Sequence, residues 1–325
     1  EYVVFLKKAS QMIPLQSELT NNTSKSKFKD LKYSILVLLA DYHVKLLHFK
    51  DAEIVIEEIL QNYQIDLNLV TLKIDMIKKK YSAKDSQLVI KYKEILKRFI
   101  MSSIFNNNIS CLESMTTFFC DLAKYSPEEA FACSEYVLTN QTSKIPLDII
   151  EKLFNNRLFI LTEFLNTSEA IKITQLKSSF DGLQRIIEEE LSETSVNSIV
   201  TLVWNYAKKL IKKTLIKEAL EWFNQLDNDI INNKISDETK NIISRAMQQC
   251  ELELGNYEKV YYIYEKKMID EEEKNNNFKT QIILFKTKVK EADDVFERNE
   301  KELNILEKIA NDCKNIILKL KQISK

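Results

Sequence analysis

The side chains in this sequence most able to bind a metal ion are His43 and His48, which are five residues apart and are its two histidines. On one continuous helix, residues with this separation point about 140° away from each other. Histidine pairs that bind a metal on a helix are three or four residues apart, so that both rings lie on one face. The spacing therefore predicts no metal site at these histidines.

The cysteines are odd in number and form no Cys-x-x-Cys pair; they are Cys111, Cys120, Cys133, Cys250 and Cys313. We predict that they are reduced thiols in the core of an intracellular protein. The first ten residues lack an initiator methionine and a signal-peptide pattern, which indicates a segment of a longer protein. No apolar run reaches the eighteen or so residues of a membrane span, so we expect no membrane association.

Catalytic motifs that need glycine are excluded, because Gly182 and Gly255 are the two glycines of the chain. Neither a nucleophile elbow, a P-loop nor a dinucleotide fingerprint can be assembled from them. The acidic runs have the form IIEEELSE and MIDEEEK, which is typical of solvated helix faces and loop ends. We therefore predict no catalytic residue, no cofactor and no small-molecule substrate.

One polar group of side chains does have the spacing of a binding surface. If two consecutive helix pairs place their first helices along a groove, Trp204, Asn205, Lys208, Lys212 and Arg245 should line it. The amide and cations could hold the backbone and carboxylates of a bound peptide, while the indole ring forms an anchor pocket. The alternative is that Trp204 belongs to the core and the lysines form an ordinary solvated surface.

The helices needed to position such a groove follow from the composition. The chain has 325 residues, two glycines and three prolines, and leucine, isoleucine, lysine and glutamate are abundant. Sheets and α/β folds need many more turn residues, so the composition predicts an all-α protein. The formal charge of −1 gives no overall attraction to a nucleic-acid backbone, and we expect no direct contact with nucleic acid.

A repeated pattern predicts how these helices are arranged. The stretch ELGNYEKVYYIYEKK joins two apolar runs through a single glycine, as in a tetratricopeptide helix pair. Small residues suited to a close crossing of two helices recur roughly 35 to 49 residues apart. They are Ala52, Val89, Ala130, Ala170, Ala219, Val260 and Val295.

The spacing exceeds the 34 residues of a regular tetratricopeptide, which indicates longer and irregular pairs. We predict a tetratricopeptide-like α-solenoid, a right-handed superhelix of about seven antiparallel helix pairs over residues 1–325, as a single segment. Residues 300–323 are expected to form one amphipathic helix that could cap the array. An ordinary helical bundle with fortuitous alanines is the alternative.

Three consecutive stretches resemble a known family. They read LVWNYAKKLIKKTLIKEALEWF, RAMQQCELELGNYEKVYYIYEKK and FKTQIILFKTKVKEAD. The series resembles the Zip-four/Spo-twenty-two family of meiosis-specific tetratricopeptide scaffolds. The matching positions are Trp204 and Asn205, then Ala219 and Trp222, then Thr280, Phe285 and Lys286. Val260 departs from the family's usual alanine, and the match covers roughly the last third of the chain.

The resemblance implies a nuclear protein on meiotic chromosomes. It would be a scaffold that joins crossover-promoting proteins of homologous recombination to proteins that begin synaptonemal-complex assembly. A general helical-repeat adaptor, as in vesicle trafficking or proteasome-lid assemblies, shares the fold and differs in its partners. A helical-repeat RNA binder would need basic, Asn/Thr-rich groove positions in every repeat, which a charge of −1 disfavours.

Overall fold

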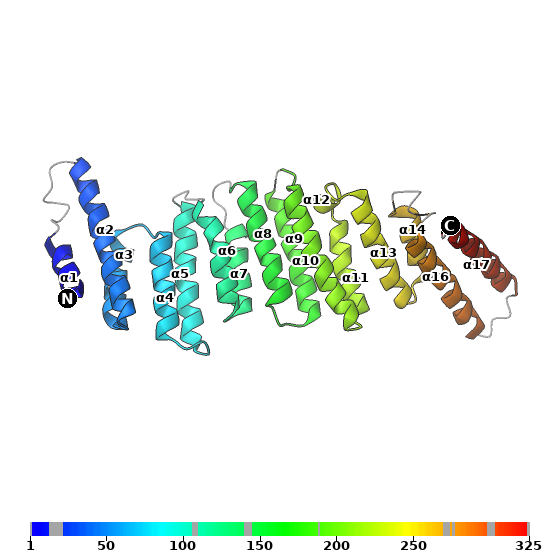
Figure 1. Cartoon of the computed structure of the whole chain (residues 1–325), viewed down its shortest axis with the longest axis horizontal. Coiled ribbons are helices and arrows are strands. Elements are labelled where there is room, and N and C mark those ends of the chain that lie inside the picture. Colours follow the sequence, from blue (N-terminus) through cyan, green and yellow to red (C-terminus); the bar gives the residue numbers. More distant parts are fainter. Residues whose placement is uncertain are drawn as a thin grey trace. The chain divides into compact units, whose positions relative to one another are not determined.

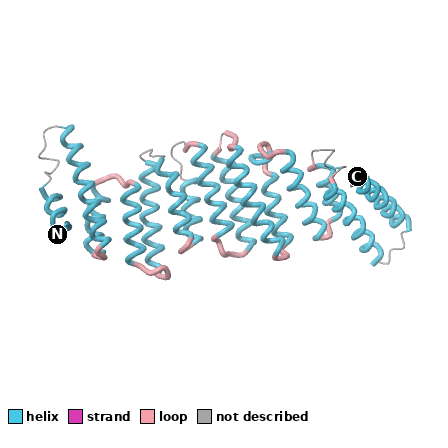
Figure 2. Tube along the Cα trace, in the orientation of Figure 1, coloured by secondary structure: helices cyan, strands magenta, loops and turns pink. Residues whose placement is uncertain are grey.

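The computed structural model describes residues 2–12, 22–105, 110–139, 145–187, 189–268, 274, 277–297 and 303–323. Within these residues the protein is all-α: the chain forms α-helices and one short 3-10 helix, and no strand (Figure 2). The helices divide into two compact units, Glu1–Leu165 and Asn166–Lys325. The all-α prediction is confirmed.

The first unit is a row of antiparallel helix pairs, α2 with α3, α4 with α5 and α6 with α7, followed by α8 (Figure 1). Its helices are α1 (Tyr2–Met12), α2 (Asn22–Lys45), α3 (Phe49–Asn62), α4 (Leu67–Lys80), α5 (Ser86–Phe105), α6 (Ser110–Ala123), α7 (Pro127–Thr139) and α8 (Leu147–Glu163). First helices of neighbouring pairs pack on each other, as α2 does on α4 and α6 on α8, and the second helices α5 and α7 do the same. Stacking of like helices is the packing pattern of an α-solenoid.

The second unit repeats this arrangement in α10 with α11 and α13 with α14 (Figure 1). Its helices are α9 (Glu169–Ile186), α10 (Glu193–Lys212), α11 (Ile216–Asn224), η2 (Gln225–Asp227), α12 (Asp229–Asn232), α13 (Asp237–Glu253), α14 (Tyr257–Lys266), α16 (Phe278–Glu297) and α17 (Leu303–Ile323). Helix α13 packs on α11 and α16, and α16 packs on α17. Ser236 caps α13, with its hydroxyl accepting the Thr239 N–H at 3.3 Å.

Three of the helix pairs share one tight turn, centred on Leu47, Thr214 and Gly255 with φ of 62°, 62° and 74°. In each turn the N–H of this residue donates to the carbonyl three residues earlier, at 3.2, 2.9 and 3.2 Å. The next N–H donates to the carbonyl five residues earlier, at 2.9, 3.0 and 2.9 Å. These are the two bonds of a Schellman motif, which satisfies the last carbonyls of the first helix. Glycine adopts the left-handed conformation without strain, which explains the single glycine in ELGNYEKV.

The buried crossing residue lies five positions after this turn in all three pairs. Ala52, Ala219 and Val260 are fully buried, and Ala130 of α7 is equally buried after a different turn. Val260 packs with Leu252 of α13 and, across the next pair, Ile283 of α16. Their burial confirms these four predicted crossing positions. A larger side chain at such a position would hold the two helix backbones apart.

The prediction for Ala170 is wrong: its side chain is exposed. Ala52, Ala130, Ala219 and Val260 are each the residue whose N–H donates to the carbonyl four positions earlier, at the start of the helix. In α9 that residue is Lys172, bonded at 3.1 Å to the Ser168 carbonyl, and its side chain is 6% exposed. The helix starts two residues later than the alanine suggested, so a cation occupies this position.

The remaining two crossing predictions have different outcomes. Val89 of α5 is only half-buried, while its neighbour Leu88 is buried. The side chain of Val295 lies outside the described residues. Residues 300–302 of the expected terminal helix lie outside them too, and the helix runs from Leu303 to Ile323.

The cysteines are free thiols, and two of them are core residues. Burial raises the pKa of Cys133 to about 11 and that of Cys250 to about 12. Cys111, Cys120 and Cys313 are half-buried, so the prediction of core thiols holds for only part of the set. None of the described helices combines the length and apolar character that crossing a bilayer requires.

Candidate protein-binding surface

The polar residues of α10 lie on one face of that helix. Its buried residues include Val196, Ile199, Val203, Ala207 and Leu210, which pack toward α11 and the core of the unit. On the opposite side Thr201, Asn205, Lys208 and Lys212 are all exposed. Their spacing of three to four residues aligns them along the helix, so they form one stripe. We call these four residues the α10 stripe.

The indole of Trp204 borders the α10 stripe. Its side chain is half-buried, and its ring lies 5.3 Å from that of Phe223 in α11, at an interplanar angle of 59°. The Lys208 ammonium stands 5.1 Å from the centre of the Trp204 ring, within the range of a cation–π interaction. The tryptophan of the core is Trp222, which is fully buried. Trp204 therefore contacts both Lys208 of its own helix and Phe223 of α11.

The lysines of the α10 stripe remain uncompensated. Among the residues that the structure describes, no carboxylate forms an ion pair with Lys208 or Lys212. By contrast, most described lysines of α4, α5 and α9 have an acidic partner, for example Lys177 with Glu221 at 2.6 Å. The stripe thus presents two cations and an amide to solvent beside an aromatic ring.

Arg245, the fifth predicted residue, lies on α13 and is half-buried. Helix α13 packs on α11, α14 and α16. Two polar residues further along α13 bond within the helix and to the next pair: Gln249 donates to Glu253 at 2.8 Å, and Glu253 faces Lys290 of α16 at 3.5 Å. The structure brings Trp204, Asn205, Lys208 and Lys212 together on α10, while membership of Arg245 in the same surface stays a prediction.

The first unit holds a groove that the sequence did not indicate. It has a volume of about 720 Å³ and runs over α4, α6 and α8, the first helices of neighbouring pairs. It is lined by Thr71, Ile74, Asp75, Lys78, Thr116, Thr117, Phe118, Cys120, Asp121, Lys124 and Asn156. We call it the α4–α8 groove.

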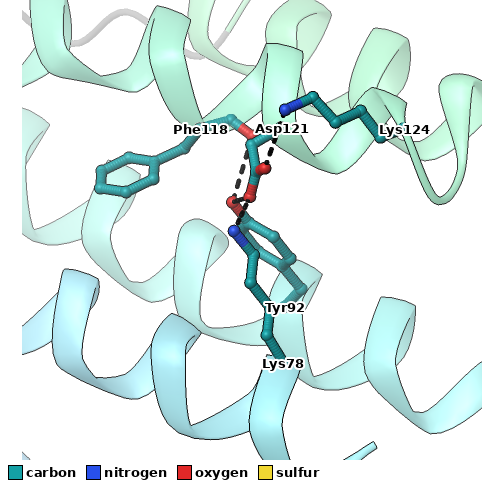
Figure 3. Close-up of polar contacts among 5 residues, drawn as sticks. All are labelled: Lys78, Tyr92, Phe118, Asp121 and Lys124. Carbon is teal, nitrogen blue, oxygen red and sulfur yellow. Dashed lines mark hydrogen bonds and ion pairs between the residues drawn. The ribbon is translucent and has the colours of Figure 1, made fainter. Parts of the chain in front are cut away.

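Asp121 is the centre of a polar network in this groove (Figure 3). Its carboxylate accepts the Tyr92 hydroxyl at 2.7 Å, pairs with Lys78, and lies 3.5 Å from Lys124. The Tyr92 hydroxyl also reaches the Phe118 carbonyl at 3.4 Å. Burial alone would raise the pKa of Asp121, but the bonds from Lys78 and Tyr92 outweigh burial and lower it. Burial and the same bond raise the pKa of Tyr92.

A second polar side chain in the groove is only half satisfied. The Asn156 amide donates to the Thr116 carbonyl at 3.2 Å and to the Cys120 sulfur at 3.0 Å. Its carbonyl oxygen is buried and accepts no hydrogen bond from any described residue. The network and this amide were missed because they join helices α4, α5, α6 and α8, whose relative register is not visible in the sequence.

The geometric reason for excluding a metal at the histidines is wrong. Helix α2 ends at Lys45, and the left-handed turn at Leu47 separates His43 from His48. The two rings lie 6.1 Å apart, and with Asp51 they place one candidate ligand atom each within 4.8 Å of the others. Residues five apart face each other here because the helix does not continue through them.

The comparisons with known proteins concern most of the chain. A family model described as "Meiosis protein SPO22/ZIP4 like" matches residues 1–225. Trp204, Asn205, Ala219 and Trp222 lie inside this match, whereas Thr280, Phe285 and Lys286 lie beyond it. The similarity to the family thus extends over the earlier helix pairs, whereas the sequence motifs covered roughly the last third of the chain.

A curated relative is Sporulation-specific protein 22 of Saccharomyces cerevisiae (strain ATCC 204508 / S288c). It is 25% identical over 313 residues, which cover 94% of this chain and 30% of the relative. The chain therefore spans less than a third of the length of that protein. Among solved structures, a circular tandem repeat protein with novel repeat topology and enhanced subunit contact surfaces matches 92% of this chain and 78% of its own, at 13% identity and a TM-score of 0.35.

Proposed function

Because this chain belongs to the SPO22/ZIP4-like family of meiosis proteins, we propose that it is a non-enzymatic scaffold for other meiotic proteins. Its partners would be subunits of crossover-promoting complexes and components of the synaptonemal complex. It would act in the nucleus, on meiotic chromosomes, through protein contacts rather than direct contacts with nucleic acid. An array of helix pairs suits this role, since it presents a long surface on which peptides and helices can dock.

The observation that carries the proposal is the α10 stripe. Lys208 and Lys212 are exposed without an acidic partner among the described residues, and Trp204 is half-buried next to them. A carboxylate of a partner can therefore form a charge-assisted hydrogen bond with either lysine. A half-buried indole supplies the apolar contact that dominates many interfaces.

The same features define the chemistry of the partner segment. Two cations and an amide on one helix face fit an acidic, amphipathic segment that lies along α10. Asn205 can both donate to a backbone carbonyl and accept from a backbone N–H, so it fixes the register of that segment. Arg245 would extend the cationic surface onto α13.

The experiment is an affinity purification from meiotic and from vegetative cell extracts with the wild-type chain and with a Lys208→Glu/Lys212→Glu variant. We expect meiosis-specific proteins to bind wild type and to be depleted by the double reversal. The matched control is Lys217→Glu/Lys266→Glu, which makes the same change of charge at exposed lysines of α11 and α14. Recovery of trafficking or proteasome-lid proteins instead, equally from both extracts, would favour a general adaptor and overturn the proposal.

A further inference from the structure

The turn between α2 and α3 gathers the two histidines of the chain and one carboxylate. The Schellman motif at this turn bonds the His48 N–H to the His43 carbonyl at 2.9 Å, which holds the two residues next to each other. Asp51 follows in the first turn of α3. The three side chains therefore meet because of the turn, although they are spread over nine positions of the sequence.

His43 is the buried member of the group. The residue is 8% exposed, and its Nδ1 accepts or donates no hydrogen bond among the described residues. Asp51 Oδ2 is the nearest acidic atom, 4.0 Å from that nitrogen. A buried imidazole nitrogen without a hydrogen-bond partner is unfavourable, and a ligand that takes its lone pair removes that cost.

The charges around His43 come from three elements. Asp51 of α3 faces it with a negative charge, while His48 in the turn and Lys7 of α1 oppose protonation. Burial has the largest effect and lowers the pKa of His43 below its ordinary value.

We propose that His43, His48 and Asp51 form a binding site for a divalent transition metal, with Zn²⁺ the best fit. Two imidazoles and one carboxylate are borderline ligands that suit zinc, whereas Mg²⁺ and Ca²⁺ prefer oxygen alone. Three protein ligands leave one tetrahedral position for water or for a side chain of a partner. The site opens onto a groove of about 730 Å³ between α1, α2 and α3, from which that fourth ligand can enter.

Little movement separates the present geometry from a zinc site. Tetrahedral ligands about 2.0–2.1 Å from zinc lie about 3.3 Å from one another. The candidate atoms are within 4.8 Å, and His48 and Asp51 are exposed side chains that can rotate inward. A bound ion would tie the end of α2 to the first turn of α3 and so stabilise the left-handed conformation of Leu47.

The test titrates zinc sulfate into the 325-residue chain, prepared without a histidine tag, treated with a chelator and kept reduced. We expect one equivalent to bind at pH 7.5 and the melting temperature to rise by a few degrees. Binding should weaken at pH 5.5, because the ligands of a metal ion must be deprotonated. His48→Ala and Asp51→Asn should each weaken it by more than about tenfold, since losing even an outer-shell partner typically costs 10–100-fold. Asp41→Asn, which removes a half-buried carboxylate paired with Lys45 on α2, is the matched control and should bind like wild type.

A second readout separates this site from the five free thiols. Cobalt(II) bound by nitrogen and oxygen shows no sulfur-to-cobalt charge-transfer absorption, and zinc should shift the NMR signals of both imidazoles. Since the chain has two histidines, their signals can be assigned from the His48→Ala spectrum. Zinc binding that survives His48→Ala, cobalt spectra of a thiolate site, or imidazole signals that zinc leaves unchanged would each overturn the proposal.

Discussion

The α4–α8 groove and the α10 stripe are both polar surfaces on first helices of their pairs, but their charges are used differently. In the groove, Asp121 lies between Lys78, Tyr92 and Lys124. Both lysines are paired with its carboxylate within the protein. On α10, the Lys208 ammonium lies over the ring of Trp204, and among the described residues neither Lys208 nor Lys212 has an acidic partner. A charge that is already paired stabilises the fold, whereas an unpaired one is available to a partner.

The largest effect on stability is expected at Asp121. Replacing it with asparagine leaves the Lys78 ammonium and the buried Tyr92 hydroxyl without their charged acceptor, and we expect unfolding to become easier by about 1–3 kcal/mol at pH 7. Because the folded pKa of Asp121 is lowered, its contribution is present above its ordinary pKa near 3.8 and is lost as pH falls through the folded value. Chemical denaturation of both proteins from pH 7 to pH 3 checks this: the gap should close at low pH, and a constant gap would contradict it.

Replacing a buried, paired lysine of the second unit should lower stability, as in the α4–α8 groove, and should leave partner binding unchanged. Lys172 donates to the Tyr206 hydroxyl at 2.7 Å, and that hydroxyl donates to Glu169 at 2.8 Å. Lys172→Met keeps most of the volume and removes the charge, so we expect a loss of about 1–2 kcal/mol with no change in partner binding. Thermal melts show the first effect and titrations the second. If Lys172→Met weakened partner binding and left stability unchanged, the contrast between internally paired lysines and the unpaired lysines of the α10 stripe would be wrong.

The turn that ends α10 offers a smaller effect of opposite sign. Thr214 has φ of 62°, a conformation that costs a non-glycine residue roughly 1–2 kcal/mol. Thr214→Gly removes that strain but adds freedom to the unfolded chain, so we expect a net gain of about 0.5 kcal/mol. The reciprocal control is Gly255→Ala, where φ is 74° and no neighbouring atom would clash with the added methyl, and which should lose about 1 kcal/mol. Equal and unchanged melting temperatures would refute the common turn.

The smallest change in stability is expected at the α10 stripe. Lys208→Glu/Lys212→Glu should alter the free energy of unfolding by less than about 0.5 kcal/mol, because exposed lysines contribute little. Binding of an acidic partner should slow, mainly in its association rate, and the loss should shrink as salt screens the charges. Stopped-flow association at low and high salt measures this. A loss independent of salt would point to a structural defect rather than to lost attraction.

The sequence predicted those features that depend on local spacing. Ala52, Ala219 and Val260 were found because each lies on a short pattern around one turn, and the face of α10 followed from a spacing of three to four residues. Ala170 failed because the start of α9 is set by the chain at Ser168, which puts Lys172 at the buried position. From the sequence, an alanine two positions away from the buried crossing position cannot be told apart from one at that position.

Two other features depend on geometry that the sequence conceals. His43 and His48 face each other because Leu47, not a glycine, adopts the left-handed conformation, and leucine gives no signal of it. The network at Asp121 needs the register of three helices, because Lys78 lies on α4, Tyr92 on α5 and Asp121 on α6. Pairs between residues of different helices can be identified only from how those helices pack.

If the α10 stripe binds a partner without supporting the fold, a change at Asn205 should affect binding and not stability. Asn205 is exposed on α10, so Asn205→Ala removes a directional hydrogen-bonding group and leaves the core intact. The measurement is a calorimetric titration of wild type and variant with the partner recovered from meiotic cells, beside thermal melts of both proteins. We expect the same melting temperature and binding weaker by about 1–3 kcal/mol, because a partner group is left unpaired. An unchanged melt together with unchanged binding would show that the partner docks on another face.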